Sequence, residues 1–329
     1  MSETLLDPAP AAASDLTYFA LAATAAPSQV AAERIPRAPG ELPEVLGGRY
    51  KIERLLGVGG MGAVYRARDL LREQFGDPEP YVALKTLSDD FAEYPDANAL
   101  LYSEFALTAR LTHPHVVRLF GFEVDVASQR AFLTLELLKG LTLDQLLSER
   151  PEGLPWAELQ GIAVPLLDAL SHSHQLGVLH GDLKPSNVML AEDGLRLFDY
   201  GLGQPVEGLL PGLPRLCRNR FSAWTPRYAA LELLDGAALS APADVYAVAC
   251  VLYELASGRH PFRRLSAKQA KAMQLDKVLQ CPTQLPAAVW PALRTALAFD
   301  EQARCIDSAE LLQAFQPRPR TRWQRWLGR

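Results

Sequence analysis

An Asp, a Lys and an Asn stand close together in the stretch HGDLKPSNVML, residues 180–190, between two apolar runs. They are Asp182, Lys184 and Asn187, and a further acid, Asp199, opens the tripeptide Asp-Tyr-Gly downstream. Carboxylate and amide oxygens are the ligands that a hard cation such as Mg²⁺ prefers, and its short coordination distances require a rigid loop. The residue types therefore suit a metal site on a loop.

A second group of residues suited to chemistry is the glycine-rich stretch GVGGMGAV, which begins at Gly57. Its G-x-G-x-x-G spacing also occurs in dinucleotide-binding turns, which continue into a helix and then a strand ending in an acid. The residues after the glycines permit a helix, but the next strand, YVALK, ends in Lys85. A P-loop would need Gly-Lys-Ser/Thr, which is missing. The third reading is two strands joined by a glycine flap whose amides cover phosphates, with Val64 on the second strand.

The composition is that of an ordinary soluble globular protein, with 49% hydrophobic and 22% charged residues among 329. This length allows one large domain or two lobes with separate cores. A net charge of −5 gives no general attraction to nucleic acid, so we expect no nucleic-acid partner. The four cysteines form no C-x-x-C pair, which favours a reducing compartment, and we expect a cytoplasmic protein.

The two ends of the chain differ from its centre in composition. Residues 1–48 are rich in Ala and Pro and show no turn-bounded strand, which predicts a flexible leader. Its apolar run at residues 15–26 follows no basic residue and is shorter than the ~20 residues that span a bilayer. Residues 317–329 contain five Arg and no acid, with two Trp on one helical face. Membrane contact by this tail is one reading, and a solvated basic tail is the favoured one.

Several separated motifs now occur in one order along the chain. After the glycine-rich loop come VALK, a helix with a Glu, HGDLKPSN, DYG, ALE, ADVY and a late Arg. This order resembles that of the eukaryotic-type (Hanks-type) Ser/Thr protein kinases, bacterial branch, from about Arg49 to Phe315. The resemblance implies an α+β, bilobal protein-kinase-like fold. It places a β-rich N-lobe at residues 49–138 and a mainly helical C-lobe at residues 139–316, with ATP between them.

The resemblance also implies a role for each polar residue of the opening stretch. Asp182 matches the base that accepts the proton of the substrate hydroxyl, and Lys184 would steady the transferring phosphate. Asn187 and Asp199 match the ligands of Mg²⁺, with Mn²⁺ as an alternative ion. Phosphoryl transfer asks the protein mainly for orientation and charge neutralisation, which these side chains could supply.

On the N-lobe side, Lys85 would contact the α- and β-phosphates and pair with Glu104 on the following helix, as in the family. Apolar residues would enclose the adenine, and the segment 136–139 would be the hinge whose backbone meets its edge. The residues expected to bind ATP are Gly57, Gly59, Gly60, Gly62, Val64, Ala83, Lys85, Glu136, Leu138 and Met189.

The chain departs from the family's pattern at three positions. Gly181 stands where the family usually has an Arg that binds a phosphate on the activation loop. We therefore expect that phosphorylation within residues 203–225 is not obligatory for activity. Tyr200 replaces the usual Phe and keeps an aromatic ring, and Leu231 replaces the Pro of Ala-Pro-Glu.

Further matches concern the framework of the C-lobe. Glu232 is expected to form a largely buried ion pair with Arg304, and Asp244 to bind the backbone of the catalytic loop. Thr225 matches the Ser/Thr-class threonine that hydrogen-bonds the catalytic Asp and Lys. Ser186 stands where many kinases that select basic substrates have Glu, which disfavours a strong demand for basic substrates.

The remaining polar residues are given ordinary roles. His172 and His174 lie at i and i+2, which is wrong for two ligands on one helical face, so surface or capping roles are favoured. His180 is expected to pack beneath the catalytic loop. The activation-loop arginines either attract an acidic substrate or a phosphate, or lie in a solvated loop; they are Arg215, Arg218, Arg220 and Arg227.

The sequence thus predicts a Ser/Thr protein kinase that transfers the γ-phosphoryl group of ATP to proteins, including itself. One alternative is a pseudokinase, a scaffold that holds nucleotide without transferring phosphate. The intact Lys85, Asp182, Asn187 and Asp199 argue against it. The other is a small-molecule kinase of related fold, against which Thr225 and the YAALE motif favour a protein substrate.

Overall fold

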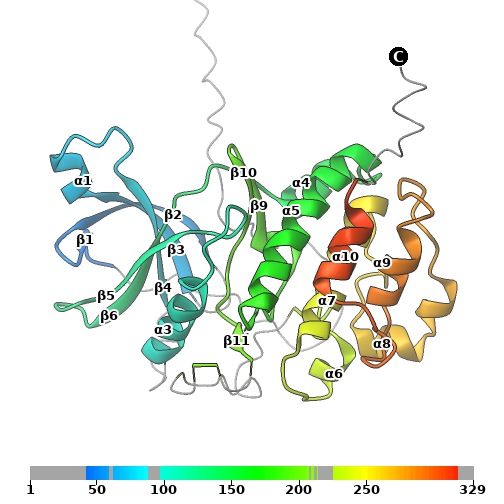
Figure 1. Cartoon of the computed structure of the whole chain (residues 1–329). Coiled ribbons are helices and arrows are strands. Elements are labelled where there is room, and N and C mark those ends of the chain that lie inside the picture. Colours follow the sequence, from blue (N-terminus) through cyan, green and yellow to red (C-terminus); the bar gives the residue numbers. More distant parts are fainter. Residues whose placement is uncertain are drawn as a thin grey trace, which may run out of the picture.

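A computed structural model describes residues 42–58, 62–87, 97–206, 209–210, 213 and 225–317. Gly59, Gly60 and Ser222 lie outside the described residues, as do three of the activation-loop arginines, nearly all of the leader and most of the basic tail. In the described part, a β-rich unit adjoins a helical one (Figure 1). The predicted α+β, bilobal fold is confirmed.

The β-rich lobe is one antiparallel sheet of six strands in the order β1-β2-β3-β4-β6-β5. Short connections favour antiparallel pairing of β1 with β2, β2 with β3 and β5 with β6, whereas a longer connection that contains α3 (Ala97–Thr108) separates β4 from β5. The strands are β1 (Val45–Leu46), β2 (Tyr50–Val58), β3 (Gly62–Asp69), β4 (Tyr81–Leu87), β5 (Leu119–Asp125) and β6 (Arg130–Leu135).

The two ends of this sheet are joined by side-chain hydrogen bonds. The Gly47 amide donates to Asp125 Oδ1 at 3.0 Å, and the Tyr50 hydroxyl donates to Glu123 Oε1 at 2.9 Å. These bonds link the β1–β2 turn to β5, the edge strand farthest from it in sheet order. The sheet is therefore curled, and α3 (Ala97–Thr108) packs against its strands β5 and β6.

The glycine-rich stretch begins on β2, which ends at Val58, and continues into β3, which begins at Gly62, so the reading of two strands rather than a helix holds. β3 runs directly after the glycines and pairs antiparallel with β2, and helix α1 (Leu70–Gln74) begins only after Asp69. A dinucleotide-binding turn, with a helix at the glycines, is therefore excluded. Position 62 requires a glycine for a steric reason, because a Cβ there would lie 1.9 Å from the carbonyl oxygen of Thr86.

The helical lobe is built around two long apolar helices, α5 and α7, with α10 packed on α5 (Figure 1). Between Ala243 and Ala256, α7 buries all but one of its residues, which makes it the centre of the larger core. The helices of the lobe are α4 (Leu143–Glu149), α5 (Trp156–Gln175), α6 (Leu231–Leu234), α7 (Ala241–Ser257), α8 (Ala267–Ala272), α9 (Trp290–Ala296) and α10 (Ser308–Phe315).

Short strands hold the catalytic segments on the inner side of this lobe. A three-stranded sheet has the order β10-β9-β7, and β8 pairs with β11. The strands are β7 (Gly140–Thr142), β8 (Val178–Leu179), β9 (Val188–Ala191), β10 (Gly194–Leu197) and β11 (Gln204–Pro205), and the short helix η1 (Pro185–Asn187) precedes β9. The HGDLKPSN stretch therefore lies between two strands that fix its ends.

Within the described ranges, no helix has the length and apolar character needed to cross a membrane. Cys250, Cys281 and Cys305 are free thiols there, whereas Cys217 lies outside those ranges.

Candidate active site

A lysine of the β-rich lobe joins two acids at the boundary between the lobes. Lys85, on β4, places its Nζ 2.7 Å from Glu104 Oε1 on α3 and 2.8 Å from Glu104 Oε2. The same Nζ lies 2.7 Å from Asp199 Oδ1, which belongs to the helical lobe. The structure thus brings together the predicted Lys–Glu pair and adds a link between the lobes.

The buried ammonium of Lys85 and the carboxylate of Asp199 stabilise each other's charged form. Burial disfavours the charged form of Lys85, but the carboxylates of Asp199 and Glu104 outweigh it and raise its pKa. Burial likewise disfavours ionised Asp199, but Lys85 and Lys184 outweigh it and lower its pKa to about 2. At neutral pH, Asp199 is therefore a carboxylate that can bind a cation.

The catalytic loop presents Asp182 next to a second lysine. Lys184 Nζ donates to Asp182 Oδ2 at 2.6 Å and to Thr225 Oγ1 at 3.1 Å. The sequence predicts that Thr225 bonds both the Asp and the Lys, whereas among the described residues it contacts Asp182 only through Lys184. Lys184 therefore joins the carboxylate to the segment that follows the activation loop.

Asn187 has an unused oxygen that fits a metal ligand. Its Nδ2 donates to the Asp182 carbonyl at 2.9 Å, which fixes the orientation of the amide. Its Oδ1 is buried and has no hydrogen-bond partner among the described residues. A buried unpaired oxygen is unfavourable unless a ligand satisfies it. Together with ionised Asp199, this oxygen gives the hard donor set that Mg²⁺ prefers.

The Asp-Tyr-Gly segment has a constrained backbone. Asp199 has a φ of 67°, a conformation that few residues other than Gly adopt. Tyr200 is buried, and its hydroxyl lies 2.8 Å from Ser173 Oγ on α5. Its ring also packs on His180, with 4.6 Å between ring centroids. The hydroxyl that distinguishes Tyr from the usual Phe therefore has a buried partner and attaches this segment to α5.

Asp244, on α7, holds the backbone of the catalytic loop. It accepts hydrogen bonds from the His180 amide at 2.8 Å and the Gly181 amide at 2.9 Å. Gly181 has a φ of 81°, which suits a residue without Cβ. The core helix thus positions the residues directly before Asp182, as the resemblance implies.

The surface or capping role expected for His174 is wrong. Its Nε2 lies 3.1 Å from Asp244 Oδ2 and its Nδ1 lies 3.1 Å from Ser308 Oγ at the start of α10. His172 is half-buried as well and stacks on the ring of His113, with 4.8 Å between centroids. The i, i+2 spacing excludes a shared metal but does not make a helix position exposed, because α5 is covered from more than one side.

The expected adenine pocket is an apolar cluster between the lobes. Val64, Ala83, Leu138 and Met189 are all buried in a second apolar cluster, which contains residues of both lobes. A pocket opens beside Lys85 and is lined by Val64, Lys85, Glu104, Thr108, Val117, Leu119, Leu135, Phe198 and Asp199. Gly57, on β2, pairs with Val64 on β3, which lines this pocket.

Glu136 can meet a nucleotide only through its backbone. Its side chain accepts a hydrogen bond from the Arg118 amide at 2.8 Å and pairs with Arg196 Nε at 3.2 Å. Its own amide donates to the Arg118 carbonyl at 2.9 Å. At the other end of the hinge, Lys139 accepts from the Glu192 amide at 2.9 Å, so both ends of the segment are fixed.

Comparison with known proteins identifies the family to which this site belongs. Residues 50–324 match the family described as the protein kinase domain. The chain belongs to the protein kinase family. Protein kinases use ATP, typically with Mg²⁺ or Mn²⁺, which agrees with the donor set of Asn187 and Asp199.

Several curated bacterial protein kinases are similar to this chain. The Serine/threonine-protein kinase PkaA of Streptomyces coelicolor is 32% identical over 77% of this chain and 47% of its own length. The DNA damage-responsive serine/threonine-protein kinase RqkA of Deinococcus radiodurans is 35% identical over 80% of this chain and 38% of its own. The chain thus spans less than half the length of these relatives.

A solved kinase structure has a similar fold. The crystal structure of the Mycobacterium tuberculosis PknI kinase domain, C20A mutant, aligns with a TM-score of 0.59 and 26% identity. The alignment covers 82% of this chain and 95% of that kinase domain. The likeness therefore extends over both lobes.

Some residues of this kinase site were not among those expected from the sequence. The pocket is also lined by Thr108, Val117 and Phe198, whose neighbouring sequence is typical of an ordinary apolar core. Of these, only Phe198 could have been predicted from the sequence, because it directly precedes Asp199. Ser173 and Ser308 likewise gain their roles from tertiary contacts that local spacing does not reveal.

Proposed function

We propose that the chain is a Ser/Thr protein kinase that transfers the γ-phosphoryl group of ATP to protein hydroxyls, including its own. The observation that carries this proposal is the Lys184 ammonium shared between Asp182 and Thr225. It places an acid that can accept a proton next to the segment where a protein substrate would lie. The ammonium of Lys85, which Glu104 holds in place, supplies positive charge for the phosphates of the nucleotide.

Each residue then has one task in the transfer. Asp182 orients the substrate hydroxyl and accepts its proton as the hydroxyl oxygen attacks the γ-phosphorus and the bond to ADP breaks. Lys184 balances charge on the transferring group, and Lys85 holds the phosphates that leave with ADP. Asn187 and Asp199 would hold Mg²⁺, which neutralises phosphate charge when bound.

Two alternatives remain to be distinguished by experiment. A pseudokinase would bind ATP without transferring phosphate, and a small-molecule kinase would label a metabolite instead of a protein. The purified chain should be incubated with γ-labelled ATP and Mg²⁺, with a general protein substrate and with EDTA as the control. We expect label on Ser or Thr that EDTA prevents. Nucleotide binding without any labelled protein would contradict the proposal.

We further propose that phosphorylation of the activation loop is not required. Gly181 has no side chain that could bind a loop phosphate, and its amide is already bonded to Asp244. Ser222→Ala, in the part of the loop outside the described residues, should therefore keep most of the transfer activity. Rates of the variant and of the phosphatase-treated wild type should be compared. A near-total loss of activity in both would contradict this independence.

A further inference from the structure

The segment 225–232, here called the acceptor-side loop, is fixed at both ends beside the proposed base. At its start, Thr225 accepts a hydrogen bond from Lys184, which also bonds Asp182. At its end, Glu232 pairs with buried Arg304 at 2.7 Å. A protein substrate whose hydroxyl reaches Asp182 must pass close to this loop, so its side chains can select the residues next to the acceptor.

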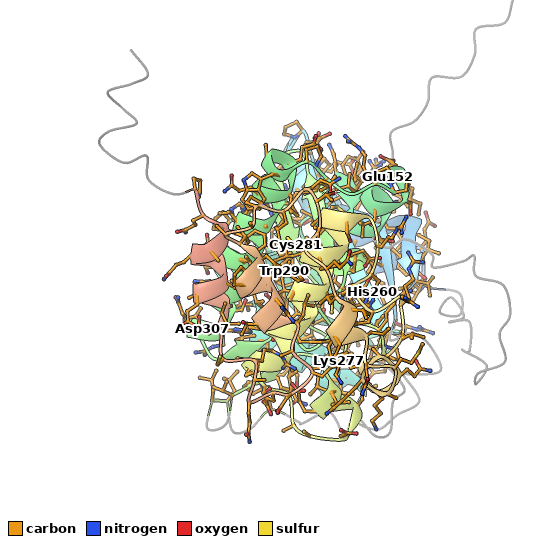
Figure 2. All side chains as sticks on the ribbon, turned by 90° about the vertical axis from the view of Figure 1, so that its right-hand side faces the viewer. Glu152, His260, Lys277, Cys281, Trp290 and Asp307 are labelled. Atoms are coloured by element: carbon orange, nitrogen blue, oxygen red, sulfur yellow. The ribbon has the colours of Figure 1, made fainter. Side chains whose placement is uncertain are left out.

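The backbone of Arg227, in the middle of this loop, is held by a neutral histidine. His260 Nε2 lies 2.9 Å from the Arg227 carbonyl, while its Nδ1 accepts from the amides of Phe262 at 3.1 Å and Arg264 at 3.2 Å. Because Nδ1 accepts two bonds, the proton is on Nε2 and is donated to Arg227. Burial lowers the pKa of His260 to about 4, so this arrangement persists at neutral pH. Figure 2, which looks onto the helical lobe, labels His260.

In the described part of the chain, the guanidinium of Arg227 has no anionic partner. Among the described residues, no carboxylate lies within ion-pair distance of it, and its buried Nε has no hydrogen-bond partner. Its Cζ lies 5.6 Å from the ring centroid of Tyr228, and the residue is half-buried. A guanidinium that has lost part of its hydration without gaining an anionic partner is stabilised most by a carboxylate or phosphate that binds it through two oxygens.

The charge of Arg227 acts on Lys184 in the catalytic loop. Burial lowers the pKa of Lys184, and Arg227 adds a smaller lowering, although Asp182 and Asp199 outweigh both. Thr225 and Arg227 are two residues apart, so their Cα atoms are separated by at most ~7.6 Å. Three extended substrate residues span ~10 Å, which is within reach of an arginine side chain at that position.

One acid that contacts this loop, Glu254, is not available for a basic substrate. Glu254 is only 2% exposed. Its Oε2 accepts a hydrogen bond from the Tyr228 hydroxyl at 2.6 Å, and its Oε1 lies 3.7 Å from Arg264 Nη2. Arg263 and Arg264 are exposed nearby on the α7–α8 connection. Next to Arg227, two exposed arginines are therefore accessible to a substrate, whereas Glu254 is not.

We propose that Arg227 determines substrate specificity by binding a carboxylate or phosphate within three residues of the acceptor hydroxyl. This inference rests on the proposed kinase function and adds the substrate class: proteins with an acidic or previously phosphorylated residue next to the acceptor. The two sources share one chemistry, an anionic oxygen pair that matches the guanidinium.

The test uses sets of peptides that differ at one residue near the acceptor, which is Ala, Glu, phosphoserine or Lys. For the wild type, kcat/KM should be at least about tenfold higher with an anionic residue than with Ala, mainly through KM. Comparison of Glu with phosphoserine shows which source is preferred. Arg227→Gln should bring the ratio close to one, and Arg227→Glu should favour the Lys peptide over the Glu peptide.

Arg259→Gln is the matched control, because it removes an exposed arginine next to His260 and should keep the wild-type preference. If the wild type phosphorylates all four peptides equally well, the inference fails while the kinase function stands. If Arg227→Gln lowers the rate equally for all four, the residue has only a structural role. If no peptide or protein is labelled at all, the proposed function itself fails.

Discussion

Replacement of Asp182 by Asn is expected to lower the rate of phosphoryl transfer by about 10²–10⁴-fold while ATP still binds. The amide cannot accept the proton of the substrate hydroxyl, but it has the same shape and can still accept the hydrogen bond from Lys184. The bond between Lys184 and Thr225 does not depend on the exchanged atom. The rate should be measured by transfer of labelled phosphate and the affinity by titration with ATP.

The matched control is Asp276→Asn, which makes the same chemical change at an exposed position in the helical lobe, on η3 (Leu275–Val278). It should leave both transfer and binding at the wild-type level. A transfer rate of Asp182→Asn equal to that of the wild type would show that another group accepts the proton. A parallel loss of ATP binding would instead indicate that the loop had collapsed.

Arg304→Met is expected to cost about 3–5 kcal/mol of unfolding free energy, because it removes one partner of a buried ion pair. The Arg304 side chain is fully buried, and it donates to Glu232 at 2.7 Å and to the Pro242 and Ala298 carbonyls at 2.9 Å each. All of these acceptors would lose their donor. A domain of this size should then unfold roughly 10 °C earlier, as measured by thermal denaturation.

Two further variants separate the ion pair from the general effect of losing an arginine. Arg294→Met, at an exposed position on α9, should change the unfolding free energy by less than ~0.5 kcal/mol. Adding Glu232→Leu to Arg304→Met should restore part of the stability, since no unpaired carboxylate is then left. If Arg304→Met unfolds at the same temperature as Arg294→Met, the pair contributes nothing measurable.

The order of motifs along the sequence was sufficient to predict the architecture and the polar residues of the cleft. Lys85, Glu104 and Asp199 are charged residues at positions where the neighbouring sequence is strongly apolar, and buried charges require partners. The pairing of Lys85 with Glu104 was predicted only because the order of motifs resembles that of the protein kinases. The contact of Lys85 with Asp199 was not predicted, because it depends on how the two lobes meet.

The directions of individual side chains could not be predicted in the same way. Glu136 was expected to meet the nucleotide through the hinge backbone, and that expectation said nothing of its carboxylate, which contacts the Arg118 amide and the Arg196 guanidinium. His174 was expected near the surface, but its partners come from α7 and α10, which are distant in the sequence. Such contacts depend on how helices cover one another, and a local pattern contains no information about that.

The contact of Lys85 with Asp199 has a consequence for the binding of a nucleotide. One ammonium is shared by acids from both lobes, so it forms an electrostatic link between them. A phosphate that approaches Lys85 must therefore compete with a carboxylate for this cation. Affinity for phosphate and cohesion of the two lobes thus depend on one and the same side chain.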